Sequence, residues 1–230
     1  MDHPVIAIDG PAAVGKSTVG RRLAERLGWT FFDTGVLYRA LAWLANDRGL
    51  SAQDEAGLAA LARELDVRVS RPSVADGRDA DIVLGDRDIT WEIRKPGVDA
   101  SVSIVAALPA VRVALVPAQR RAAAEGPAVV VGRDIGTVIF PEAPLKVYLD
   151  ATPEERARRR AAELAARGSR ERHEDVLARL RRRDSLDSGR LHAPLSVARD
   201  AWRIVTDQRT VDEVVEEVLR LWQARAAEPR

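Results

Sequence analysis

Short apolar runs alternate along the chain with stretches whose apolar residues recur at helical spacing. The apolar runs predict strands near residues 4–9, 30–33, 128–132, 145–149 and 203–206. The periodic stretches predict helices over residues 15–27, 35–48, 54–65, 108–124, 153–167, 173–184 and 211–225. Strands that alternate with helices are typical of an α/β fold with a parallel sheet. The run 128–132 is apolar throughout, as expected for a strand covered on both faces.

Two segments depart from this alternation. Residues 66–91 have a strand-like pattern on both sides of Asp76-Gly77, which predicts a turn and a small inserted sheet. Residues 151–184 are rich in Arg and Glu. They fit either a solvated helical face with Glu–Arg pairs or a lid that carries guanidinium groups over phosphates. The lid is favoured for the region, and the solvated face for any single arginine.

Helix ends are marked as well. Gly28 and Gly49 stand where C-terminal caps are expected, and Thr210 with Glu213 has the spacing of a capping box.

A phosphate-binding motif, G-x-x-x-x-G-K-[ST], joins the first predicted strand to the first predicted helix. We predict that this phosphate-binding loop binds ATP through Gly10, Pro11, Ala12, Ala13, Val14, Gly15, Lys16, Ser17 and Thr18. Glycines let backbone N–H groups turn toward phosphate oxygens, and the helix N-terminus adds partial positive charge. Lys16 would reach the outer phosphates, and the Ser17 hydroxyl would ligate Mg²⁺.

The composition limits the class of protein. The 230 residues include 36 Lys or Arg, of which only Lys16, Lys95 and Lys146 are lysines, and the net charge is +1. A charge this small gives no case for a nucleic-acid or membrane partner. Cysteine is absent, and we find no signal peptide or transmembrane run, so we expect a cytoplasmic protein.

The remaining motifs favour a kinase over a switch or a motor. The only asparagine, Asn46, is followed by Asp47, so the guanine-binding N-K-x-D motif is absent. Arginines follow two predicted strands, at Arg39 and Arg133, and strand ends of open α/β sheets are where ligands gather. Paired arginines beside a phosphate-binding loop indicate an acceptor that is itself anionic.

At this point the chain resembles the bacterial cytidylate (CMP) kinases over nearly its whole length. The matching segments are Ile8-Asp9-Gly10-Pro11, Asp33-Thr34-Gly35 with Tyr38-Arg39, Glu92-Ile93-Arg94, Ser103 with Arg112, Gly132-Arg133-Asp134-Ile135-Gly136-Thr137, Phe140-Pro141, and Arg183-Asp184-x-x-Asp187-Ser188-x-Arg190 with Ala193-Pro194-Leu195. The phosphate-binding loop is generic to many kinases, whereas the segments around Arg133 and Asp187 are far more particular.

The resemblance implies one P-loop nucleoside monophosphate kinase domain over residues 1–230. The implied fold has three layers, with a five-stranded parallel sheet, a small antiparallel substrate-side insertion at about 66–91 and a helical lid at about 151–170. The implied reaction is ATP-dependent, uses Mg²⁺, and converts CMP or dCMP to the diphosphate.

The resemblance also implies roles for single residues. The residues that would bind the substrate are Thr34, Arg39, Ser103, Arg112, Arg133, Asp134, Arg183, Asp187 and Arg190. Arg39, Arg133 and Arg190 would hold the acceptor phosphate, Asp187 with Arg183 the ribose, and Ser103, Arg112 and Asp134 the cytosine edge. The residues expected to act in catalysis are Lys16, Arg133, Arg159 and Arg183. Arg156, Arg159 or Arg160 would contact the phosphates from the lid.

Some alternatives stay open at this stage. A related kinase acting on UMP, AMP or shikimate is the second interpretation, and a regulator with ATPase or GTP-binding activity is the third. Asp134 could be a structural partner of an arginine, because its residue type alone does not separate that role from base recognition. With no surplus apolar face in the sequence, we expect a monomer.

Overall fold

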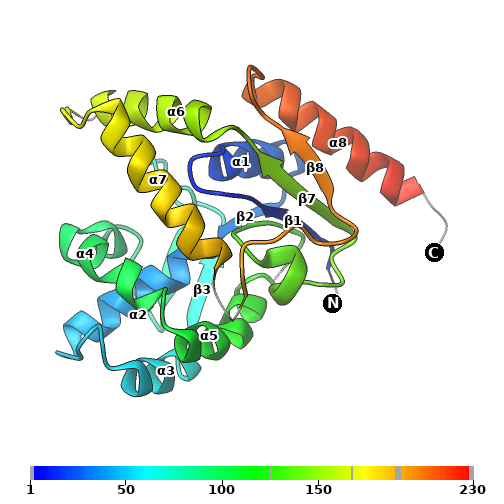
Figure 1. Ribbon diagram of the computed structural model, residues 1–230. Coiled ribbons are helices and arrows are strands. Elements are labelled where there is room, and N and C mark those ends of the chain that lie inside the picture. The colour runs from blue at the N-terminus through cyan, green and yellow to red at the C-terminus, as the bar shows by residue number, and fades with distance from the viewer. Residues whose placement is uncertain (1–2, 125, 167, 190–192, 228–230) are drawn as a thin grey trace. The chain divides into compact units, whose positions relative to one another are not determined.

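The computed structural model describes residues 3–124, 126–166, 168–189 and 193–227. Within them, one sheet runs in the order β2-β6-β1-β7-β8 (Figure 1). Its strands are β1 (Val5–Asp9), β2 (Thr30–Asp33), β6 (Ala128–Val131), β7 (Leu145–Asp150) and β8 (Trp202–Val205). The β1–β7 and β7–β8 pairs are parallel. The prediction of an α/β fold with a five-stranded parallel sheet is therefore confirmed.

The predicted helices are all present among the described residues. They are α1 (Lys16–Leu27), α2 (Gly35–Asp47), α3 (Glu55–Arg63), α5 (Pro109–Ala122), α6 (Pro153–Ala166), α7 (His173–Ser188) and α8 (Val211–Ala227). Helix α4 (Pro96–Val105) was not predicted, because its β-branched residues and Gly97 give the segment a low helix propensity. Helix α7 continues four residues beyond the predicted end, so that it includes Asp187.

The chain divides into two compact units, residues 1–5 with 24–130 and residues 6–23 with 131–230. In the first unit, α3 packs against α5 and α2 against α4. This unit also holds the predicted small antiparallel sheet, made of β3 (Val67–Ser70), β4 (Asp81–Leu84) and β5 (Arg87–Asp88). Gly77, with φ of +88°, lies in the connection between β3 and β4, where the turn was expected. Arg78 holds this connection by ion pairs with Asp76, Asp81 and Asp88.

In the second unit, α8 packs against β7, and α6 packs against α7 (Figure 1). The capping box of α8 is formed as predicted: the Thr210 N–H donates to Glu213 at 2.8 Å, and the Glu213 N–H donates to Thr210 Oγ1 at 3.3 Å. The predicted caps at Gly28 and Gly49 have φ of +68° and +67°, the left-handed conformation that glycine favours. Among the described residues no single helix is long and apolar enough to cross a membrane, although the bent pair α4–α5 has the length and composition when its two helices are taken together.

Candidate active site

The phosphate-binding loop leaves β1 through a backbone turn that only glycine permits. Gly10 has φ of +150°, and a Cβ there would lie 2.2 Å from the Leu149 carbonyl oxygen. Gly15 has φ of +100°, and Ala13 between them is also left-handed, with φ of +60°. A loop bent in this way, which leads directly into a helix N-terminus, is suited to bind an anion through its backbone N–H groups.

Lys16 starts α1 and lies across the loop. Its Nζ donates to the Pro11 carbonyl oxygen at 2.6 Å, and the residue is buried. The loop therefore carries a positive charge fixed over its own backbone. Ser17 follows in the first turn of α1, where its hydroxyl is on the same helix end.

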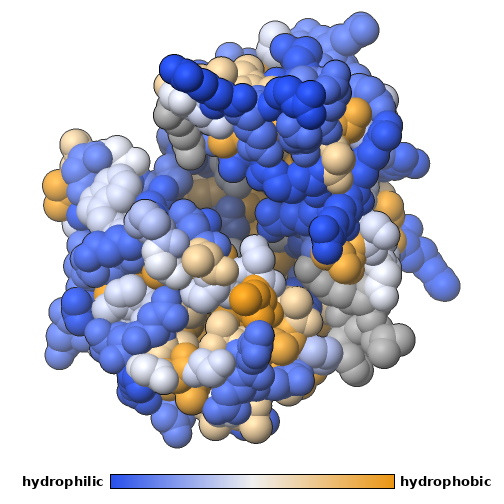
Figure 2. Space-filling model, turned by 60° about the vertical axis from the view of Figure 1, so that its left-hand side comes forward, coloured by the Kyte–Doolittle hydropathy of each residue, from blue (hydrophilic) through white to orange (hydrophobic). Residues whose placement is uncertain are grey.

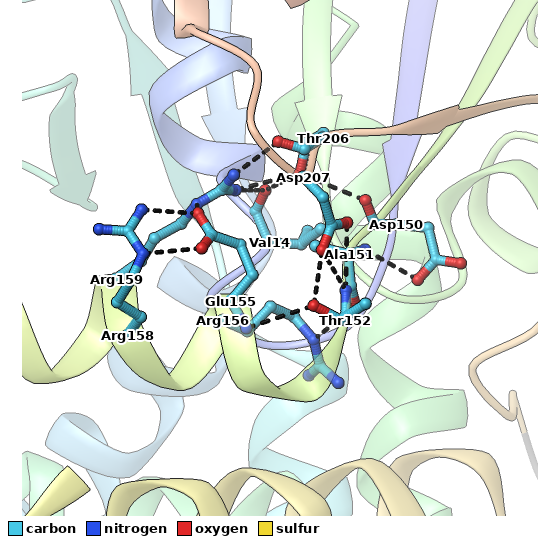
Figure 3. Close-up of polar contacts among 10 residues, drawn as sticks. All are labelled: Val14, Asp150, Ala151, Thr152, Glu155, Arg156, Arg158, Arg159, Thr206 and Asp207. Atoms are coloured by element: carbon cyan, nitrogen blue, oxygen red, sulfur yellow. Dashed lines mark hydrogen bonds and ion pairs between the residues drawn. The ribbon is translucent and has the colours of Figure 1, made fainter.

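Residues of helix α6 contact the phosphate-binding loop (Figure 3). Arg159 Nη1 donates to the Val14 carbonyl oxygen at 3.3 Å, and the Arg159 guanidinium also bonds Glu155 and the Thr206 carbonyl. Thr206 Oγ1 reaches the same Val14 oxygen at 3.4 Å. Arg159 was expected to contact phosphates from the lid. The structure assigns it several partners in the protein, and phosphate contact stays a prediction.

Arg156 joins the loop to α7. It is 4% exposed, and its Nη1 donates to the Ala12 carbonyl oxygen at 3.3 Å and to Asp184 at 2.6 Å. Its Nε donates to the Ala151 carbonyl oxygen at 3.1 Å. One buried guanidinium thus holds the phosphate-binding loop, the start of α6 and α7 together.

The predicted residues Arg133, Arg183 and Asp187 lie together in the second unit. Asp187, on α7, is 2% exposed and accepts from Arg133 Nε at 3.0 Å. Arg183, one turn earlier on α7, has its Nε 4.0 Å from the same carboxylate oxygen. The segment after β6 and the last turn of α7 therefore bring an acidic residue and two arginines into one cluster. Arg190 lies outside the described residues.

The segment after β6 is also fixed to the end of β1. The Gly132 N–H donates to the Ile8 carbonyl oxygen at 3.0 Å. Asp9 is buried and accepts the N–H groups of Ile135 and Gly136, each at 2.8 Å. Burial raises the pKa of Asp9 to about 6, although these two backbone donors act in the opposite direction. Asp134, the predicted base reader, is buried next to this contact.

The first unit holds the other predicted substrate residues. Arg39 donates to Asp99 at 2.6 Å and to the Ile93 carbonyl oxygen at 3.2 Å. Arg112 is buried, and its guanidinium lies 5.6 Å from the centre of the Tyr38 ring. Ser103 is exposed on α4, and Thr34 is the buried N-cap of α2.

Comparison with known proteins decides the family. The family model described as cytidylate kinase matches residues 6–224. The chain belongs to the cytidylate kinase family. The resemblance inferred from the motifs around Arg133 and Asp187 is therefore confirmed.

Several curated relatives match along most of their length. A cytidylate kinase of Herpetosiphon aurantiacus is 49% identical over 94% of this chain and 93% of its own length. One of Roseiflexus castenholzii is 47% identical over 92% and 90%. The bifunctional pantoate ligase/cytidylate kinase of Synechococcus elongatus is 45% identical over 97% of this chain, which spans 42% of that protein.

Solved structures support the fold alone. A shikimate kinase from Acinetobacter baumannii in complex with shikimate has a TM-score of 0.50 and 18% identity, and the match covers 98% of this chain and 96% of that one. An uncharacterized protein from Eubacterium ventriosum has a TM-score of 0.52 and 12% identity, over 95% and 98%. Cytidylate kinase family membership is carried by the sequence relatives and not by these structures.

Sequence reasoning did not assign roles to Asp9, Asp184 and Thr206. Each makes a contact that fixes the loop or the segment after β6. Asp9 and Asp184 lie within the motifs that carry the family resemblance, but their hydrogen-bond partners are distant in sequence. A role for Asp9 could have been inferred more easily, because it is a carboxylate at the end of a buried strand directly before the loop.

Proposed function

We propose that this chain transfers the γ-phosphoryl group of ATP to CMP, and also to dCMP, and releases ADP with CDP or dCDP. The whole-length match to curated cytidylate kinases carries the proposal. The geometry of the phosphate-binding loop agrees with it, because the Lys16 charge and the bent backbone are suited to bind the donor phosphates.

The acceptor is a phosphate oxygen that is already ionised near neutral pH, so the reaction needs no strong general base. The residues have to align the two phosphates and offset the charge that develops on the transferring group. Lys16 is suited to the donor phosphates, and Arg133 and Arg183 to the acceptor side. We propose that Asp187, which accepts from Arg133 Nε at 3.0 Å, also accepts hydrogen bonds from the ribose hydroxyls.

No group of three or more His, Cys, Asp or Glu side chains in the described part of the chain could hold a metal. In a phosphate-binding loop the hydroxyl that follows the lysine is the usual protein ligand of Mg²⁺, and phosphate oxygens and water complete its coordination. Ser17 stands at that position, in the first turn of α1. We propose Ser17 as the protein ligand. When bound, the ion would offset negative charge on the donor phosphates.

The nucleoside would be recognised through the cytosine edge. We propose that Arg112, Ser103 and Asp134 read the cytosine edge. Cytosine offers an amino donor beside two acceptors, which a carboxylate and a guanidinium complement. Uracil has a carbonyl in place of that amino group, and the mismatch with a buried carboxylate costs roughly 1–3 kcal/mol.

The acceptor phosphate would be bound by arginines. We propose that Arg39, Arg133 and Arg190 hold it, and that Thr34 assists them. Arg39 is already paired with Asp99 in this structure, so phosphate would compete with that carboxylate for the guanidinium.

We further propose one domain with a substrate-side insertion at about 66–91 and a lid at about 151–170. Lid closure would keep water from the γ-phosphate. The protein would be cytoplasmic and monomeric, without nucleic-acid or membrane partners. On the face drawn in Figure 2, hydrophobic residues occur in small groups among hydrophilic ones.

A nucleotide-panel assay tests the function. ADP release is measured with ATP and either CMP, dCMP, UMP, AMP or shikimate as acceptor, with the Lys16→Met variant as control. CMP and dCMP should support the highest kcat/KM, and ATP alone should be hydrolysed slowly. Rapid ADP release without an acceptor, or preference for another acceptor, would contradict the proposal. CMP alone should also raise the Tm, as expected for a ligand that binds the folded state.

A further inference from the structure

The carboxylate of Asp9 caps a turn that belongs to a distant part of the chain. Asp9 ends β1, whereas the turn is the π-helical segment Ile135–Ile139. The two carboxylate oxygens accept separate bonds, Oδ1 from the Ile135 N–H and Oδ2 from the Gly136 N–H, both at 2.8 Å. The first two N–H groups of the turn are therefore satisfied from outside their own segment.

Asp134 precedes this turn and occupies its N-cap position, but its side chain makes no capping hydrogen bond there. Aspartate is among the residues that most favour capping in that position. An N-cap side chain binds the N–H of the second or third helical residue, and Asp9 occupies the second of these, at Gly136. Asp9 thus holds the backbone of the two residues that directly follow Asp134.

Gly136 packs against Lys146 and Asp9. A Cβ on Gly136 would lie 3.1 Å from Lys146 Cδ and would crowd that side chain, whereas its distance of 3.4 Å from Asp9 Oδ2 is an ordinary van der Waals contact. The carboxylate is buried beside Lys16 and Asp134, and burial raises its pKa, so its retention there costs free energy.

We propose that Asp9 is a positioning residue for base recognition. By holding the N–H groups of Ile135 and Gly136, it fixes the backbone from which the Asp134 side chain extends, so that the Asp134 carboxyl can accept from the cytosine amino group. This inference rests on the proposed function, because it takes Asp134 as the residue that reads cytosine.

The variant Asp9→Asn tests the inference. An amide has one acceptor oxygen, and its NH₂ group would face one of the two backbone N–H groups, which would loosen the backbone next to Asp134. The ratio of kcat/KM for CMP to that for UMP should fall about three- to tenfold, as expected for partial loss of a buried hydrogen bond. Asp9→Glu should lower the same ratio, because its longer side chain moves both acceptor oxygens away from these N–H groups, and it serves if Asp9→Asn does not fold.

Two comparisons separate positioning from a general loss of stability. Asp54 caps α3 by accepting the Gly57 N–H at 2.9 Å, so Asp54→Asn should lower the Tm and leave the CMP/UMP ratio unchanged. The double variant Asp9→Asn/Asp134→Asn should have the same ratio as Asp134→Asn alone, because Asp9 acts through Asp134.

The outcomes are distinct. A folded Asp9→Asn or Asp9→Glu variant with the wild-type ratio would overturn the inference, and so would a further fall of the ratio when Asp9→Asn is added to Asp134→Asn. An Asp134→Asn variant with the wild-type ratio would also overturn it. Failure of the wild type to phosphorylate CMP would instead overturn the proposed function.

Discussion

Replacement of Arg156 should loosen the phosphate-binding loop more than replacement of any exposed arginine on α6. Arg156 is 4% exposed and has three acceptors, the carbonyls of Ala12 and Ala151 and the carboxylate of Asp184. Arg156→Met keeps much of the aliphatic stem but leaves these acceptors without their donor.

The size of the effect follows from the burial of the pair. Removal of one partner of a fully buried ion pair costs about 3–5 kcal/mol. The side chain of Asp184 is 21% exposed, so water would offset part of this loss. We therefore expect Arg156→Met to lower the free energy of unfolding by roughly 2–4 kcal/mol. A double-mutant cycle with Asp184→Asn should give a coupling free energy of about 1–2 kcal/mol.

The assay combines urea unfolding with steady-state kinetics. Because the Ala12 carbonyl belongs to the loop, Arg156→Met should raise the KM for ATP in the fraction that remains folded. The matched control is Arg160→Met, since Arg160 pairs with Glu163 on the same helix and both side chains are about a third or more exposed. Exposed pairs of this kind contribute little. A stability of Arg156→Met equal to that of Arg160→Met, or zero coupling with Asp184, would refute the reasoning.

Three further predictions concern other parts of the chain. Lys16→Met should lower kcat about 100-fold or more, as expected for loss of a fixed charge at the reacting phosphates, whereas Lys95→Met, at an exposed pair with Glu92, should not. Asp9 has a pKa raised to about 6, so its contribution to stability is full below about pH 3.8 and is lost as pH rises through 6. The unfolding free energy of the wild type minus that of Asp9→Asn should thus fall by about 2–3 kcal/mol between pH 4 and 7, and a flat or rising difference would contradict the assignment. Thr210→Ala should cost about 1 kcal/mol in urea unfolding, because it removes the cap of α8; an unchanged midpoint would show that the capping box contributes nothing.

The parts of the fold that the sequence predicted are those with a strong local pattern. The strand at 128–131 is buried along its whole length, so its apolar run had no competing interpretation. Helix α4 has an ambiguous pattern. Val98, Val102 and Val105 have helical spacing, but apolar residues at 98, 100, 102 and 104 also alternate with polar ones as in a strand, and Ile104 is exposed.

The candidate site was predicted to the extent that its residues belong to motifs. The cluster of Arg133 with Asp187 joins segments 54 residues apart, and only the family resemblance linked them in advance. Periodicity ended α7 at residue 184, before Asp187, because polar residues continue beyond that point. The helix nevertheless extends to Ser188, and this places Arg183 and Asp187 one turn apart.

The arginines of α6 show why residue type alone could not assign roles. The sequence could not distinguish the roles of Arg156, Arg159 and Arg160, because all three lie in the arginine-rich stretch 156–160. The structure distinguishes them by the partners of their guanidinium groups. Arg156 donates to the Ala12 carbonyl and to Asp184. Arg159 donates to the Val14 carbonyl and to Thr206, and Arg160 donates to Glu163 of the same helix. Two of the three are held against carbonyl groups of the phosphate-binding loop. A guanidinium that binds a loop carbonyl fixes the orientation of that peptide unit. The N–H of the same unit points in the opposite direction from the carbonyl, and N–H groups of this loop are the ones expected to face phosphate. In this arrangement Arg156 and Arg159 can favour phosphate binding without touching the nucleotide.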